Sequence, residues 1–280
     1  MAFSARRLRG PLALPMLRAP MTPERLDQLT RIALEVAEEA AAQVMQAYRT
    51  AVRASEKARS DLVTRYDLES EQLIRARLRE LTPDLPVVGE EEGGRADGPT
   101  WFCDPIDGTT NFVHGHPFFC VSLGLLDGTQ PLLGAVVAPA LDVRWYGAVG
   151  RGAFRNGSPC KVSDTRALPD ALLATGFHPR SQGSPPHDNV GSFATMLPAS
   201  RGIRRCGSAA IDACMVADGT YDAYWERLLN TWDVAGGAAI ALAAGARLSN
   251  LQGQSADLSI GHVLLSNGHI HDALLELLNT

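Results

Sequence analysis

The sequence predicts an α/β (α+β) fold, and three patterns along its 280 residues lead to that prediction. Apolar residues recur at helical spacing between residues 22 and 48. Short β-prone segments separated by turn residues follow between residues 118 and 149. Strand and helix patterns then alternate toward the end of the chain. Together these patterns favour sheets that are covered by helices.

The first half, residues 21–160, is expected to begin with two helices. The first should run from Thr22, a good N-cap, to about Tyr48. The polar stretch 50–60 reads as a connection to a second helix, which should end at Pro83. The expected strands of this half are residues 85–88, 101–103, 118–126, 131–138 and 143–149, followed by hairpin turns over 150–157.

The second half, residues 161–280, should alternate strands with helices. Its expected strands lie within residues 171–177, 203–206, 221–226 and 248–261. Its expected helices begin near Gly207, Trp232 and Asn267. The polar loop 180–188 should form the flexible rim of a site. Residues 1–20, which carry four arginines and no acid, are expected to be an N-terminal extension, with translation starting at Met21.

Composition and charge narrow the class of protein. The net charge is −5 and the pI is near 5.8, so no nucleic-acid or anionic-membrane partner is expected. No apolar run is long enough for a transmembrane helix. The five cysteines form no C-x-x-C pair, which indicates neither a disulfide framework nor a zinc site. A reducing, cytoplasmic location is therefore expected.

Residues 101–112 read W-F-C-D-P-I-D-G-T-T-N-F and carry the strongest chemical signal. The carboxylates of Asp104 and Asp107, with the carbonyl of Ile106, are hard oxygen ligands that suit Mg²⁺. The N–H groups after Gly108, at a helix start, suit a phosphate. Metal ligands beside a phosphate cradle indicate phosphoryl chemistry. A D-x-x-D-G-T stretch alone is equally typical of a turn followed by a helix cap.

The complete W-x-x-D-P-I-D-G-T-T-N-F string resembles the signature of the inositol monophosphatase family of Mg²⁺-dependent, lithium-sensitive phosphatases. Two further matches follow the family pattern, V-x-G-E-E over residues 87–91 and W-D-x-A-G-G over residues 232–237. The resemblance covers essentially residues 21–280. It implies a layered α/β/α/β/α sandwich of the sugar-phosphatase type, with the metals gathered where the two halves meet.

The same resemblance implies two or three Mg²⁺ ions and the residues that hold them. The implied ligands are Glu90, Asp104, the Ile106 carbonyl, Asp107 and Asp233. Glu90 and Thr109 would orient the attacking water, and Asp104 would bridge two ions. Read alone, Glu90 could lie in a solvated acidic loop, and Asp233 could be a helix N-cap.

Substrate-binding residues are implied in both halves. Asp107, Gly108 and Thr109 would contact the phosphate region, Gly207, Ser208 and Ala209 would form a wall, and Glu226 would bind a polyol hydroxyl. Asp67 and Glu91 would support the metal ligands from behind. The competing interpretations are an ordinary strand-to-helix turn for 207–209 and a surface carboxylate for Glu226. His178, inserted between Phe177 and Pro179, departs from the family pattern.

The predicted function is a phosphomonoesterase that hydrolyses myo-inositol monophosphate, a small phosphorylated polyol, by a metal-activated water. Histidinol phosphate or another small sugar or polyol phosphate is the alternative substrate. A regulatory binding protein that retains the phosphatase fold is the alternative from another functional class. A homodimer is expected from the family alone.

Overall fold

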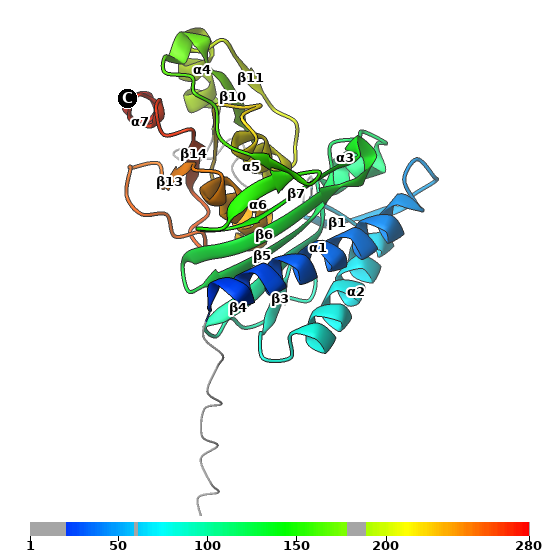
Figure 1. The fold of residues 1–280 in the computed structure, drawn as a ribbon. Helices are drawn as coiled ribbons and strands as arrows, with labels where there is room; N and C mark the ends of the chain where they lie inside the picture. The colour runs from blue at the N-terminus through cyan, green and yellow to red at the C-terminus, as the bar shows by residue number, and fades with distance from the viewer. Residues whose placement is uncertain (1–20, 59–60, 178–188, 280) are drawn as a thin grey trace, which may run out of the picture.

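The computed structural model describes residues 21–58, 61–177 and 189–279. Two expectations lie outside these residues, the extension 1–20 and the rim loop 180–188 with the preceding His178. Within the described ranges the first half carries a seven-stranded sheet and a two-stranded one, and the second half carries a five-stranded sheet. Helices cover the two large sheets and also lie between them (Figure 1).

Helices α1 (Pro23–Met45) and α2 (Arg65–Leu81) lie side by side on the outer face of the first sheet. The side chain of Thr22 caps α1 as expected, but the helix ends before Tyr48. The stretch 50–60, predicted as a connection, contains the strand β1 (Ala54–Ala58), which pairs antiparallel with β2 (Asp61–Thr64), the segment just before the second helix. This prediction was wrong because a polar two-stranded ribbon lacks the apolar alternation that marks a half-buried strand.

The first sheet has seven strands in the order β3-β4-β5-β6-β7-β8-β9. These are β3 (Val87–Gly89), β4 (Pro99–Asp107), β5 (Cys120–Asp127), β6 (Gln130–Ala138), β7 (Val143–Ala148), β8 (Gly152–Arg155) and β9 (Ser158–Cys160). Strand β4 is longer than predicted and runs through Asp104 and Asp107, with an irregular register between them. That irregularity sets both carboxylates at one end of the strand.

The second sheet has five strands in the order β11-β10-β12-β14-β13. These are β10 (Leu172–Thr175), β11 (Gly202–Arg204), β12 (Ala223–Glu226), β13 (Arg247–Ser249) and β14 (Val263–Ser266). The range 248–261 predicted for the closing strands was wrong for β14, which follows it. Its four residues are all buried between β12 and β13, and so short an apolar run carries no clear period.

Helices α5 (Ala209–Ala217) and α6 (Thr231–Ala243) pack together between the two sheets. Helices α4 (Val190–Ala199) and α7 (His271–Leu278) cover the outer face of the second sheet. The layers therefore follow the predicted α/β/α/β/α order, with the short helix α3 (Thr109–Val113) next to the site.

Helix α6 approaches the first sheet closely because glycines face each other across the contact. A Cβ atom built on Gly134 would lie 2.2 Å from the carbonyl oxygen of Gly236, so a side chain there would push the helix away. Helix α6 also carries Asp233 at its start. The close packing therefore fixes where this carboxylate lies.

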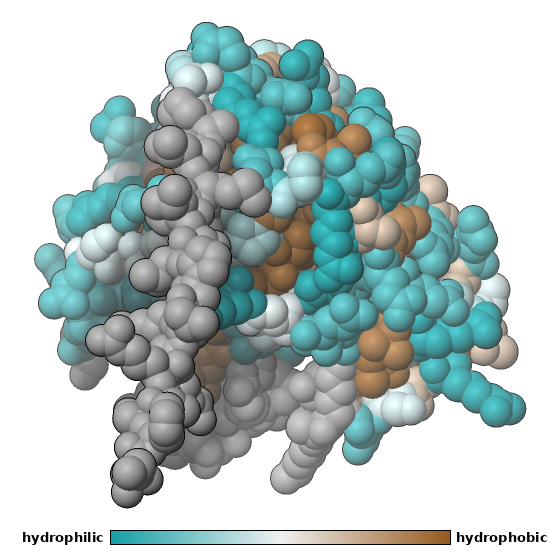
Figure 2. Space-filling view, turned by 90° about the horizontal axis from the view of Figure 1, so that it is seen from below, coloured by the Kyte–Doolittle hydropathy of each residue, from teal (hydrophilic) through white to brown (hydrophobic). Residues whose placement is uncertain are grey.

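None of the helices in the described ranges combines the length and apolar character that crossing a bilayer requires. On the face seen in Figure 2, hydrophilic side chains predominate and hydrophobic ones form separate small areas. The large apolar side chains instead fill three clusters within the layers.

Candidate functional site

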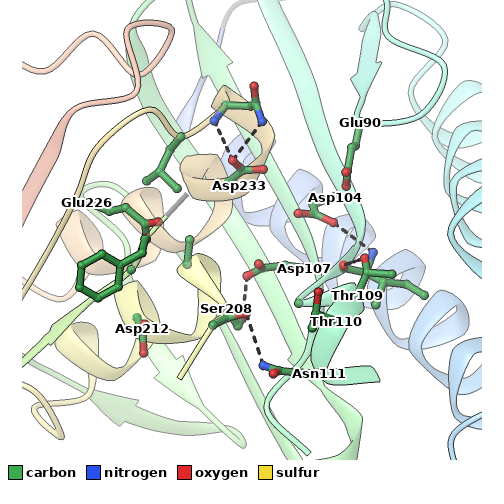
Figure 3. A pocket seen from close by; sticks show the side chains of 18 of the residues that line it. Glu90, Asp104, Asp107, Thr109, Thr110, Asn111, Ser208, Asp212, Glu226 and Asp233 are labelled. Carbon is green, nitrogen blue, oxygen red and sulfur yellow. Dashed lines mark hydrogen bonds between the residues drawn. The ribbon is translucent and has the colours of Figure 1, made fainter. Parts of the chain in front are cut away.

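A pocket of about 320 Å³ lies where the two halves meet (Figure 3). It is lined by every residue predicted to bind metal or substrate: Glu90, Asp104, Ile106, Asp107, Gly108, Thr109, Gly207, Ser208, Ala209, Glu226 and Asp233. Asp67 and Glu91, which were predicted to act from behind, are not among its lining residues. The structure thus brings segments up to 143 positions apart (233 minus 90) to one place.

Asp107 is tied to the second half by hydrogen bonds. Its Oδ2 accepts from the Ser208 hydroxyl (2.6 Å), from the Ala210 N–H (2.7 Å) and, more weakly, from the Cys120 thiol (3.7 Å). Ser208 is also the N-cap of α5. Helix α5 therefore presents its positive end to the Asp107 carboxylate, which is a stabilising arrangement.

Asn111, the penultimate residue of the W-F-C-D-P-I-D-G-T-T-N-F string, also joins the two halves. Its Nδ2 donates to the carbonyls of Phe118 (2.6 Å) and Cys206 (2.8 Å). No pattern in the sequence had indicated a role for this amide. Its contacts fix the start of α3 relative to the turn before α5.

The hydroxyl of Thr109 forms a hydrogen bond with the carboxylate of Asp67. Thr109 Oγ1 lies 2.9 Å from Asp67 Oδ1 and 3.0 Å from the Ile106 carbonyl oxygen. Asp67 Oδ2 in turn accepts from the N–H (2.8 Å) and hydroxyl (2.6 Å) of Thr64, which closes a capping box at the start of α2. Asp67 thereby links α2 to the turn that follows β4.

The loop that carries Glu90 is fixed by an ion pair that sequence reasoning missed. Glu71 is fully buried, and its carboxylate accepts from the N–H groups of Glu91 (2.7 Å) and Glu92 (2.9 Å) and from Arg75 Nε (2.7 Å). Arg75 also donates to the backbone carbonyls of Val87, in β3, and of Gly93, in the loop. Glu71 and Arg75 are four residues apart on α2, and this spacing could have predicted their ion pair from the sequence.

Gly89 leaves the space that this carboxylate occupies. A Cβ atom built on Gly89 would lie 2.4 Å from Glu71 Oε1, closer than any real contact. The glycine of V-x-G-E-E is therefore required by the approach of Glu71 to the loop. Glu91, predicted as a supporting neighbour, contributes its backbone N–H to that contact.

Asp233 stabilises the start of helix α6 and also lines the pocket. It occupies the third position of α6, and its Oδ2 accepts from the Asn230 N–H (2.7 Å) and side-chain amide (3.2 Å). The N-cap itself is Asn230. The alternative interpretation of Asp233 as the N-cap was therefore wrong by three positions, although one of its oxygens does bind the helix start while the side chain faces the cavity.

Burial and mutual repulsion act on the pocket carboxylates. Burial, and after it the charge of Glu90, raises the pKa values of Asp104 and Asp233 well above their ordinary range. Burial also raises the pKa of Asp107 to about 6, although its hydrogen bonds from Ser208 and the start of α5 oppose the shift. A bound cation would relieve this repulsion.

Chemically, these donors fit a hard cation such as Mg²⁺, because carboxylates and a carbonyl are the ligands it prefers. Geometrically, no three His, Cys, Asp or Glu side chains in the described ranges are grouped closely enough to hold a metal ion. The donors nevertheless line one pocket, and charge interactions couple Glu90 to Asp104 and to Asp233. Side-chain rotations would have to bring these groups to a common ion.

Glu226 lies in the second half's part of the pocket and is buried. Its Oε2 accepts from the Tyr224 hydroxyl (2.6 Å). A Cβ atom on Gly176 would lie 1.9 Å from the same oxygen, so the carboxylate rests against the Gly176 backbone. Burial raises the pKa of Glu226 to about 7, against the effect of the Tyr224 hydrogen bond.

Asp212, in the first turn of α5, also lines the pocket, and the sequence analysis did not select it. An aspartate in the first turn of a helix is ordinary, because it complements the helix dipole. Its position in the pocket follows only from the packing of α5 beside β12. No local signal distinguished it.

The comparisons with known proteins agree with this geometry. The model of the Inositol monophosphatase family matches residues 25–280. Inositol monophosphatase 3 of Solanum lycopersicum is 37% identical over 261 residues, covering 91% of this chain and 97% of the relative. The Nus factor SuhB of Pseudomonas aeruginosa is 38% identical over 230 residues, covering 80% and 85% of the two chains.

The fold is also similar to that of a solved structure. The inositol monophosphatase from Anabaena (Nostoc) sp. superposes with a TM-score of 0.83 at 36% identity. The match covers 91% of this chain and 96% of that one.

Proposed function

The chain belongs to the inositol monophosphatase family, whose members are generally metal-dependent, and on this premise we propose a specific activity. As a phosphoric monoester hydrolase it acts on a phosphorylated small molecule. The proposed reaction is Mg²⁺-dependent, lithium-sensitive hydrolysis of myo-inositol monophosphate to inositol and phosphate. The observation that carries it is one pocket in which acidic side chains, backbone donors and the buried Glu226 meet.

In this proposal Glu90, Asp104, the Ile106 carbonyl, Asp107 and Asp233 hold two or three Mg²⁺ ions. When bound, the cations supply a nucleophilic water at neutral pH and neutralise negative charge on the phosphate. The residues of the chain position the reactants, which supplies most of the catalysis in phosphoryl transfer.

Thr109 and Glu90 are the residues proposed to orient the attacking water. The contact between the Thr109 hydroxyl and Asp67 supports this role, because it fixes the side chain before substrate arrives. The Glu71 and Arg75 ion pair would do the same for the loop of Glu90.

The N–H groups of Gly108 and Thr109 are proposed to bind the phosphate, at the start of α3. Because α3 spans only Thr109–Val113, its dipole adds little, and the individual hydrogen bonds must carry the binding. Gly207, Ser208 and Ala209 would form the opposite wall. Glu226 would accept a hydrogen bond from a hydroxyl of the alcohol.

A regulatory role is the second candidate, and one observation favours it. A relative with 38% identity is named a Nus factor. Such a role would be compatible with hydrolysis, and with the homodimer and cytoplasmic location that we also propose. Asp104→Asn would separate the two, since binding of a macromolecular partner should survive while hydrolysis is lost.

The test measures phosphate release from myo-inositol 1-phosphate, histidinol phosphate and fructose 1,6-bisphosphate, with Mg²⁺, with EDTA, and with Mg²⁺ plus Li⁺. We expect release to be fastest on inositol phosphate, to need Mg²⁺ and to be inhibited by Li⁺. Asp104→Asn should lower kcat/KM at least about 10³-fold without loss of folding, because it removes a charge that the reacting centre needs.

The exposed Asp84, which pairs with Arg25 on the surface, provides the matched control. Asp84→Asn should leave the rate unchanged. Fastest release from histidinol phosphate would overturn the proposed substrate. Absence of release from all three would overturn the proposed phosphatase specificity altogether.

A further inference from the structure

Asp212 is a buried carboxylate with an unused hydrogen-bonding atom. Only 1% of the residue is exposed, and its Oδ1 has no hydrogen-bond partner. The side chain nevertheless lines the pocket between the two halves. Buried polar atoms in native proteins are almost always paired, so an unpaired acceptor at the wall of a binding pocket indicates a ligand.

The surroundings of Asp212 increase the cost of leaving it unpaired. Burial, and after it the charge of Glu226, raises the pKa of Asp212 well above its ordinary range. Asp107 acts in the same direction, while the guanidinium of Arg205 acts against it. Two buried carboxylates that repel each other destabilise the folded chain unless something binds between or beside them.

Figure 3 places Asp212 and Glu226 on the same side of the pocket, away from Glu90 and Thr109. Asp212 comes from the first turn of α5, and Glu226 from the end of β12. The carboxylate of Glu226 rests against Gly176, and its Oε2 accepts from the Tyr224 hydroxyl. Oδ1 of Asp212 is buried without a hydrogen-bond partner, and Oε1 of Glu226 is not engaged by Tyr224.

We propose that Asp212 and Glu226 form a hydroxyl-binding subsite, in which Asp212 accepts a hydrogen bond from a second hydroxyl of the alcohol part of the substrate. This assignment deepens the proposed function and rests on it. Asp212 thereby becomes a specificity-determining residue that selects phosphate esters of polyols over esters of alcohols without further hydroxyls.

Hydroxyls fit this subsite better than an ammonium group does. Arg205 lines the same pocket, and its positive charge acts on both Asp212 and Glu226. A second cation from the ligand would be repelled by that guanidinium. A carboxyl group whose pKa is raised can also donate as well as accept, and a hydroxyl is the partner that satisfies both roles.

The experiment compares wild type with Asp212→Asn on four esters: myo-inositol 1-phosphate, glycerol 2-phosphate, phenyl phosphate and histidinol phosphate. For the two polyol esters we expect kcat/KM to fall about tenfold, the usual loss for one hydrogen bond to a charged group. For phenyl phosphate, which has no hydroxyl beyond the ester, the change should stay within about twofold.

Thermal unfolding provides a readout that a structural role would not produce. Because the aspartate is unpaired and is repelled by Glu226, Asp212→Asn should leave the Tm unchanged or raise it. The matched control is Asp218→Asn at the end of the same helix, where Asp218 accepts from Trp145 Nε1 (2.8 Å). That variant should lower the Tm and should change kcat/KM by the same factor for all four esters.

Two outcomes would overturn the subsite. One is an equal loss on phenyl phosphate and the polyol esters. The other is a loss that is largest on histidinol phosphate, which would mean that the pair binds a cation. If wild type fails on myo-inositol 1-phosphate, the proposed function fails, but the ratio of glycerol 2-phosphate to phenyl phosphate still tests Asp212.

Discussion

The two sides of the pocket differ in how their carboxylates are held. On the side of the first half, Asp107 has three hydrogen-bond donors, and the loop of Glu90 is fixed by the buried Glu71. On the side of the second half, Asp212 has a buried oxygen without a partner. The first side is thus prepared within the protein, and the second is left to be completed by a ligand.

This difference corresponds to two chemical tasks. Groups that position a phosphate and its metals must be fixed before the reaction, because misplacement is costly in rate. Groups that distinguish one alcohol from another gain selectivity when the wrong ligand leaves them unpaired in a buried place. Stability is therefore expected to depend on the first side and selectivity on the second.

The largest expected effect on stability comes from breaking the ion pair behind the Glu90 loop. Glu71→Gln leaves the buried Arg75 guanidinium with only the exposed Glu92 as an anionic partner, and we expect the free energy of unfolding to fall by about 3 kcal/mol. Urea denaturation would measure it. Glu35→Gln, at an exposed ion pair with Arg77, is the matched control and should cost less than about 1 kcal/mol.

The same pair of variants also separates the roles of the two sides of the pocket in catalysis. Glu71→Gln should also lower kcat/KM equally for polyol and phenyl phosphates, because the loop serves the phosphate end. If Glu71→Gln were no more destabilising than the surface control, the loop would be held by other contacts, and the contrast with Asp212 would disappear.

His271, outside the pocket, is a buried titratable group whose hydrogen bonds are all satisfied, and it can be compared with the unpaired Asp212. Its two ring nitrogens lie 2.8 Å from the hydroxyls of Ser249 and Ser266. Burial, assisted by the charge of Arg247, lowers the pKa of His271 to about 4. The unfolded chain, with an ordinary histidine near 6.5, therefore binds a proton more readily than the folded one.

Stability due to His271 is fully present above pH 6.5 and is lost as the pH falls toward 4. Between pH 8 and pH 5 the loss should be about 2 kcal/mol. Urea unfolding of wild type and His271→Gln across this range would measure it, and the variant should show a flatter dependence. His269→Gln, at an exposed neighbour, should retain the wild-type slope. Equal slopes for all three proteins would contradict the assignment.

The smallest expected effect concerns the contact that joins the halves at Asp107. Ser208→Ala removes a donor to that carboxylate and the N-cap of α5. We expect kcat/KM to fall about tenfold and the free energy of unfolding by about 1 kcal/mol. Ser208→Thr, which keeps the hydroxyl, should recover most of both. Failure of threonine to restore activity would mean that the hydroxyl is not what matters.

Part of the site could be predicted from local sequence. Asp104 and Asp107 lie within one continuous string, and Asp233 and Glu90 lie in short patterns of their own, so their selection did not require knowledge of the packing. The pocket contains all of them. The five layers were implied by the family resemblance, while the helical and strand patterns alone indicated only a mixed α/β fold.

Other features depended on partners that are distant in the chain. The β1–β2 ribbon has polar residues on both faces, and its strands are held by backbone hydrogen bonds that leave no apolar period. Glu71 and Arg75 looked like an ordinary helical ion pair until their loop partners were known. Asp107 is satisfied by Ser208 and Ala210 from the other half, about 100 positions away.

Local sequence specifies which chemical groups are present and most of the turns, caps and strands that carry them. Those features depend on neighbours within a few positions, and a continuous motif records them directly. Only the tertiary structure decided which carboxylates are satisfied and which are left open, as Asp107 and Asp212 illustrate. Hydrogen-bond satisfaction inside a protein depends on groups brought together by packing, and packing relates residues whose separation in sequence has no period to detect.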